Sequence, residues 1–120
     1  MVFNTMQTTY IGQKAEQVAA QYLERQGYTI LDQNWRRRTC EIDLVAKKGT
    51  TIHLVEVKYR QTNIAGSGLE YITTAKLRQM AYSAERWVAE NDWQGEYVLS
   101  AVEVSGETFE VTEFIESIDS

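Results

Sequence analysis

The sequence lacks several features that would place the protein outside the cytoplasm. It contains a single cysteine, Cys40, which excludes an internal disulfide and fits a reducing compartment. No apolar run is long enough to cross a bilayer, and residues 1–10 lack the charged segment followed by an apolar segment that marks a secretory signal. Repeats, low-complexity tracts and linkers are also absent. We therefore expect a cytoplasmic protein without membrane contact, folded as one domain over residues 1–120.

Basic residues are missing from the C-terminal part of the chain. Residues 88–120 contain nine acidic residues and no Lys or Arg, whereas residues 1–87 contain all twelve Lys and Arg and eight acidic residues, a net charge of +4. The overall net charge of −5 by itself argues against a nucleic-acid-binding protein. Because the local field matters more than the total charge for a polyanion, the basic part of the chain keeps nucleic acid open as a partner.

The hydrophobic pattern predicts seven elements in the order αβββαββ. Apolar residues at three- and four-residue spacing indicate helices, and alternating apolar residues indicate strands. The predicted helices begin at a cap of Thr8 or Thr9 and of Thr73 or Thr74 and end near Gln26 and Asn91, and the predicted strands cover residues 28–31, 41–45, 52–59, 97–104 and 108–114. We expect residues 61–68 to form a mobile loop and residues 1–8 and 116–120 to fray. This order favours an α/β domain with a mixed sheet and helices packed on it.

The segment Cys40–Arg60 predicts a β-hairpin that carries acidic residues. Its strands join at a turn around Gly49, between two runs of alternating polarity. Residues two apart in a strand share a face, so Glu56 and Lys58 are expected to project together. If the hairpin pairs symmetrically about its turn, Asp43 lies near the level of Glu56 on the neighbouring strand.

Such a group of charges is unfavourable unless a ligand uses it. Like charges held close repel each other, and burial adds a desolvation cost. Mg²⁺ removes this repulsion because it takes oxygen ligands, needs one or two carboxylates and keeps water and substrate phosphates in its other positions. A neighbouring lysine can orient a water molecule or offset charge on phosphorus. The pattern therefore predicts a metal site for phosphodiester cleavage, with a surface ion-pair cluster as the alternative.

Further residues resemble the YraN-type family of small bacterial proteins, in order and with matching spacing over residues 11–104. They are Gly12-x-x-x-Glu16, Gly27-Tyr28, Asn34-x-Arg36, Glu41-Ile42-Asp43-Leu44, Val55-Glu56-Val57-Lys58-x-Arg60, Gly66 and Lys76. The family is similar to the restriction-endonuclease-like (PD-(D/E)xK) nucleases, which include archaeal Holliday-junction resolvases. The resemblance implies an α/β restriction-endonuclease-like fold, a mixed sheet flanked by helices, and a nuclease-like domain.

The resemblance also implies a catalytic triad of Asp43, Glu56 and Lys58. Asp43 and Glu56 would hold Mg²⁺ or Mn²⁺ with help from the Val57 carbonyl, and Lys58 would position the attacking water. Glu16 on the first helix would be an accessory carboxylate of the metal site. On the alternative interpretation, Glu16 is a solvated helix residue.

The remaining polar residues near the hairpin are candidates for other roles. Lys76, Arg60 and the run Arg36-Arg37-Arg38 are candidates for holding a nucleic-acid backbone, although an arginine run is also typical of a solvated turn. Glu41 is a candidate for supporting the metal ligands from behind, and the alternative is an ion pair with Arg38 or Lys58.

The sequence departs from the family pattern at two places. Cys40 stands where the family usually has glycine, so its side chain is expected to crowd the approach of a backbone or phosphate. Residues 98–100 lack the Arg-x-Asp pair that the family tends to have in the fourth strand. We expect Cys40 to be structural, His53 to face away from Glu56, and Trp35 and Trp93 to be partly buried rather than to stack on bases.

These observations lead to three functional hypotheses. The first is a Mg²⁺- or Mn²⁺-dependent endonuclease acting on DNA, with branched or structured DNA as a candidate substrate and a homodimer as a candidate assembly. The second is a catalytically silent nucleic-acid-binding or assembly module of the same fold. The third is a protein-binding adaptor that uses the acidic C-terminal part.

Overall fold

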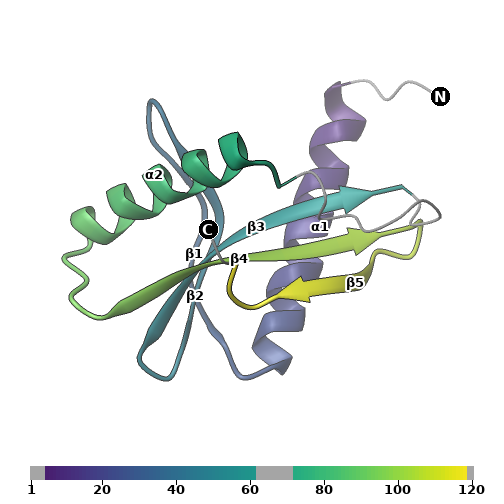
Figure 1. Ribbon diagram of the computed structural model, residues 1–120. Helices are drawn as coiled ribbons and strands as arrows, with labels where there is room; N and C mark the ends of the chain where they lie inside the picture. Colours follow the sequence, from purple (N-terminus) through teal and green to yellow (C-terminus); the bar gives the residue numbers. More distant parts are fainter. Residues whose placement is uncertain (1–4, 62–71, 119–120) are drawn as a thin grey trace.

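The computed structural model describes residues 5–61 and 72–118, with the side chains of residues 5–8 left out. These residues form a mixed five-stranded sheet with a helix on each face (Figure 1). The elements are α1 (Thr5–Arg25), β1 (Thr29–Arg36), β2 (Glu41–Lys48), β3 (Thr51–Arg60), α2 (Thr74–Glu90), β4 (Glu96–Ser105) and β5 (Glu110–Ile115). The expected α/β class and the order αβββαββ are confirmed.

The strands lie in the order β1-β2-β3-β4-β5 across the sheet. All neighbouring pairs are antiparallel except β3 and β4, which are parallel. A parallel pair needs a crossover connection, and α2 lies in that connection. The β2–β3 hairpin pairs Lys48 with Thr51 and Leu44 with Val55, so its register is symmetrical about the turn at Gly49, as expected.

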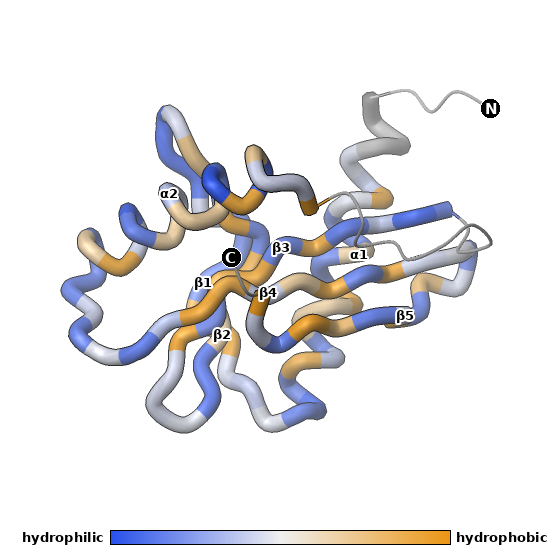
Figure 2. The backbone as a smooth tube through the Cα atoms, in the orientation of Figure 1, coloured by the Kyte–Doolittle hydropathy of each residue, from blue (hydrophilic) through white to orange (hydrophobic). Residues whose placement is uncertain are grey.

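Each helix covers one face of the sheet with its own hydrophobic core. Helix α1 presents small residues such as Ala15 and Ala19 beside Leu23, which lets it pack closely on Leu44 and Val55. On the other face, α2 packs through Ala84 and Trp87 against a set formed by Trp35, Cys40, Ile42, Val45, Ile52 and Leu54. Figure 2 shows apolar residues along the central strands and hydrophilic residues at the tip of the β1–β2 connection.

Strand β1 is longer than the sequence pattern predicted. The expected strand covered residues 28–31, with Asn34 to Arg36 as a connection, but the strand continues to Arg36. Trp35 explains the extension, because this residue is only 5% exposed and belongs to the α2-side core. Asn34 adopts a positive φ of 52° within this strand, a conformation that Asn tolerates better than most residues.

The chain ends also differ from the expected pattern. Helix α1 begins at Thr5, earlier than a cap at Thr8 or Thr9 would allow. Residues 116–118 were expected to fray, but the Ile118 amide donates to the Leu99 carbonyl at 2.8 Å and the Ser100 hydroxyl donates to the Glu116 carbonyl at 2.5 Å. Residues 1–4 and 119–120, and the expected loop apart from Gln61, lie outside the described residues. In the described part of the chain, neither helix combines the length and apolar character needed to span a bilayer.

Replacing either of two glycines by alanine should change the free energy of unfolding, in opposite directions for the two positions. Gly27 follows α1 with φ +94°, a conformation that side chains rarely adopt, so Gly27→Ala should lower the free energy of unfolding by about 1–2 kcal/mol. Gly12 lies within α1 and a Cβ there would meet nothing within 4 Å, so Gly12→Ala should raise it by about 0.5–1 kcal/mol. Urea unfolding of both variants measures the two shifts, and equal signs would contradict the assigned backbone conformations.

Candidate functional site

Strands β2 and β3 stop pairing in the regular way at Asp43. Their register ends at Leu44↔Val55, and beyond that pair the Val57 amide donates to Oδ2 of Asp43 at 2.8 Å. Ile42 and Leu44 are two residues apart, yet Ile42 packs in the α2-side core and Leu44 in the α1-side core. Because regular strand residues two apart share a face, the chain must twist at Asp43. The side chain of Asp43 therefore lies in the gap between the two strands.

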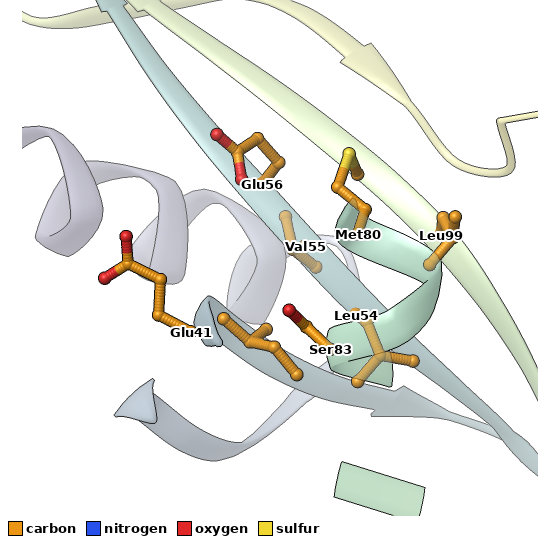
Figure 3. A pocket seen from close by; sticks show the side chains of 8 residues that line it. Glu41, Leu54, Val55, Glu56, Met80, Ser83 and Leu99 are labelled. Carbon is orange, nitrogen blue, oxygen red and sulfur yellow. The ribbon is translucent and has the colours of Figure 1, made fainter. Parts of the chain in front are cut away.

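Four acidic residues surround this gap, and we call them the acidic notch: Glu16, Glu41, Asp43 and Glu56. Glu16 reaches from α1 and hydrogen-bonds with Asp43 and with the side chain of Asn34. Figure 3 shows Glu41 at the start of β2 and Glu56 on β3, on the two sides of the gap, with α1 behind it. The notch thus combines side chains of the β2–β3 hairpin with Glu16 of α1, which is distant in sequence.

The carboxylates of the notch lie close enough to repel each other when they are ionised. Burial raises the pKa of Asp43 to about 7, and the negative charges of Glu56, Glu16 and Glu41 add to this shift. The hydrogen bond from the Val57 amide acts in the opposite direction but does not offset the burial. Burial also raises the pKa of Glu16, against the hydrogen bonds with Asn34 and Asp43. An added cation would relieve this repulsion.

Two of the carboxylates are already paired with cations from neighbouring elements. The Nζ atom of Lys76, on α2, lies 3.1 Å from Oε2 of Glu56. The guanidinium of Arg36, on β1, lies 2.5 Å from Oε2 of Glu41. Glu41 was expected to pair with Arg38 or Lys58 if it formed an ion pair, and the structure gives it Arg36 because Arg36 and Glu41 are directly opposite in the β1–β2 ladder.

Two members of the proposed triad, Asp43 and Glu56, come together at the gap from opposite faces of the sheet. Asp43 contacts Glu16 on the α1 side, whereas Glu56 lines a small pocket with Met80 and Ser83 on the α2 side. The two carboxylates meet at the gap, where the charge of Glu56 acts on Asp43. Lys58 is exposed and follows Glu56 by two residues on the same face of β3.

The oxygen donors of the notch fit an open Mg²⁺ site. Asp43 and Glu56 supply two carboxylates. The Val57 carbonyl faces the same gap, because the N–H and C=O of one residue point to the same neighbouring strand and this N–H reaches Asp43. Among residues 5–61 and 72–118, no three His, Cys, Asp or Glu side chains are arranged to enclose a metal ion. The donor set suits Mg²⁺, which leaves several positions to water and phosphate, and not a closed site such as that of structural zinc.

The three arginines of the β1–β2 connection have separate environments. Arg37 stacks over Trp35 at 4.5 Å and its Nη2 atom lies 2.6 Å from Glu90 of α2, so it joins the connection to the helix. Arg36 is paired with Glu41, while Arg38 is exposed and forms no ion pair with a described residue. The three line an open recess of about 250 Å³ beside the notch, and Gln79 of α2 completes it. Arg36 and Arg38 are therefore better placed than Arg37 to meet a ligand.

Arg60 is also held by a residue that the sequence did not single out. Its Nη1 atom lies 3.6 Å from Oε2 of Glu103, a side chain on β4 that is buried and accepts a hydrogen bond from Thr112 at 2.5 Å. The parallel β3–β4 register, which places Arg60 two residues beyond the Lys58↔Glu103 pair, brings these groups together. No local sequence signal reveals this contact, because it depends on the strand order.

Two residues that were expected to take no direct part in catalysis are largely buried, although Cys40 also lines the recess beside the three arginines. Cys40 is buried in the α2-side core. His53 is buried, with Nδ1 3.0 Å from the Ser100 hydroxyl and its ring against Tyr28. Burial lowers the pKa of His53, so it is neutral near pH 7. The Ser100 hydroxyl donates to the Glu116 carbonyl and lies against His53, so it serves the packing around this ring. Asn34 is the site residue that pattern analysis left without a role.

A family model and the related sequences assign the chain to the same family. The family described as uncharacterised protein family UPF0102 matches residues 15–113. A UPF0102 protein of Vibrio campbellii is 45% identical over 80 residues, covering 67% of this chain and 66% of the relative. A UPF0102 protein of Cytophaga hutchinsonii is 37% identical over 100 residues, covering 83% and 88%. One of Chloroflexus aurantiacus is 46% identical over 82 residues, covering 68% and 66%. The chain thus spans slightly less than two thirds of two of these relatives.

Asp43→Asn should raise the free energy of unfolding at pH 8 without divalent cations, by about 1–3 kcal/mol. Asn still accepts the Val57 amide but carries no charge. Because the pKa of Asp43 is raised from 3.8 to about 7 on folding, its contribution to stability is present at low pH and is lost as the pH rises through 7. The advantage of Asp43→Asn should therefore shrink as the pH is lowered towards 4.

Urea unfolding at several pH values measures this difference. Glu110→Gln, an exposed position on β5, removes the same charge away from the notch and serves as the control. Equal stability of wild type and Asp43→Asn at pH 8 would show that the notch carries no excess repulsion.

Proposed function

The chain belongs to the uncharacterised protein family UPF0102, and from its acidic notch we propose that it is a metal-dependent endonuclease that acts on DNA. One observation carries the proposal: Asp43 is held in a gap of the sheet beside Glu56 with its pKa raised to about 7. A protein gains nothing in stability from such repulsion, and strongly shifted groups in a recess are typical of functional sites. Oxygen donors with positions left open for water and phosphate favour phosphodiester hydrolysis.

Each residue of the notch has a role in the proposed reaction. Asp43, Glu56 and the Val57 carbonyl would hold Mg²⁺ or Mn²⁺, with Glu16 behind Asp43. The bound ion would stabilise charge on the phosphate and make water a stronger nucleophile. Lys58 would orient the attacking water, whose oxygen forms a bond to phosphorus while the bond from phosphorus to the leaving ester oxygen breaks. The proton released by the water is balanced by the proton that the leaving oxygen takes up.

The DNA backbone would approach along the basic residues beside the notch. Arg36 and Arg38 line the recess next to Glu41, and Lys76 lies at the far side of the notch on α2. Arg60 extends this set along β3. Phosphate contacts of this kind fix position and give salt-dependent affinity without reading sequence. We therefore propose structured or branched DNA as the substrate and the cytoplasm as the location of the reaction.

A second candidate is a nucleic-acid-binding or assembly module without turnover. The observation that favours it is that Glu56 and Glu41 are both occupied by protein cations, Lys76 and Arg36. Such a module would bind DNA in a salt-sensitive way but would need no metal and release no product. The two functions separate in one assay that follows binding and cleavage together.

Lys58→Ala should reduce the rate of DNA cleavage with Mg²⁺ by about 100-fold or more, because the attacking water loses its orienting group. The measurement is cleavage of single-stranded and branched oligonucleotides, with circular dichroism to confirm the fold. Lys48→Ala, at the hairpin turn away from the notch, loses the same charge and should cleave like wild type. Equal rates for wild type and Lys58→Ala would rule out the assigned role.

Arg38→Ala should weaken DNA binding and reduce the salt dependence of the binding constant by about one phosphate contact. Arg37→Ala should instead lower the unfolding temperature, because Arg37 joins the β1–β2 connection to Glu90. Fluorescence anisotropy at several salt concentrations and thermal unfolding separate the two effects. A full loss of binding in Arg37→Ala with an unchanged melting temperature would reverse the assignment.

A further inference from the structure

Lys76 occupies one of the carboxylates that the proposed function gives to the metal. It lies in the first turn of α2, where Thr73 caps the helix and its hydroxyl accepts the Lys76 amide. The Nζ atom is 3.1 Å from Oε2 of Glu56, and the two side chains are only 28% and 20% exposed. A partly shielded ion pair is screened less by solvent than a surface pair. Lys76 therefore neutralises Glu56 in the described state.

A lysine in this position opposes the binding of a divalent cation. The Lys76 ammonium and the divalent cation would both contact the Glu56 carboxylate. Two positive groups on one carboxylate lie close together and repel each other. Oε2 of Glu56, which contacts Lys76, also cannot donate its full charge to the metal. Burial raises the pKa of both Asp43 and Glu16, although the charge of Arg36 acts on Glu16 in the opposite direction.

We infer that Lys76 exchanges its partner, from Glu56 to a phosphate of the nucleic acid, and thereby couples metal binding to nucleic-acid binding. A phosphate at the notch offers the ammonium an alternative anion, and Glu56 is then released to the metal. Coupling of this kind is reciprocal, so the nucleic acid tightens metal binding and the metal tightens nucleic-acid binding. This inference rests on the proposed function and adds a regulatory role for Lys76 as a positioning residue.

The test is a calorimetric titration of Mn²⁺ into the full chain without nucleic acid. Lys76→Met should bind Mn²⁺ about 5–10-fold more tightly than Arg78→Met, because only the first variant frees Glu56. Arg78 is the matched control, since it lies two residues further along α2, is exposed and loses the same charge. Lys76→Gln serves as a second variant if Lys76→Met does not keep the circular dichroism spectrum of the wild type.

A second arm repeats the titration with a saturating phosphorothioate oligonucleotide, which keeps the phosphate charge and resists cleavage. The oligonucleotide should tighten Mn²⁺ binding about tenfold in the wild type and in Arg78→Met, and clearly less in Lys76→Met. Equal Mn²⁺ affinities for Lys76→Met and Arg78→Met, with measurable binding in both, would overturn the exchange while leaving the metal site intact. No Mn²⁺ binding by any of the proteins, with or without the oligonucleotide, would overturn the proposed function itself.

Discussion

The hydrogen bond from the Val57 amide to Asp43 is the interaction on which the site depends. In a continuous antiparallel ladder, this amide would pair with a main-chain carbonyl of β2. Here a side-chain carboxylate takes that place at 2.8 Å, so the backbone donor is satisfied although the strands separate. The exchange leaves a gap in the sheet and fixes a negative charge within it. It also directs the Val57 carbonyl towards the same gap.

The gap lets two helices on opposite faces act on one site. Helix α1 reaches it with Glu16, and α2 reaches it with Lys76, although the sheet separates the helices elsewhere. In an unbroken sheet, side chains on the two faces point away from each other and are separated by the strands between them. The acidic notch is thus a consequence of where β2 and β3 part, which brings the Glu16–Asp43 contact close to the Lys76–Glu56 ion pair.

Much of this arrangement follows from the sequence because local rules decide it. The turn at Gly49 and the alternating runs around it fix the hairpin register, and that register sets Asp43 near the level of Glu56. The irregularity at Asp43 was not predictable, because strict alternation assigns Ile42 and Leu44 to one face. Likewise, Arg36 was not recognised as the partner of Glu41, since this pair requires β1 to extend through the buried Trp35. In both cases tertiary packing overrides the local pattern.

The strand order also separates the acidic C-terminal strands from the arginines of the β1–β2 connection. Strands β4 and β5, which carry Glu96, Glu103, Glu110 and Glu113, form one side of the sheet, and β1 with the arginine connection forms the other. The net charge of −5 is therefore distributed unevenly across the molecule. For the proposed nucleic-acid substrate, this distribution of charge would favour an approach from the β1 edge over an approach from the β5 edge.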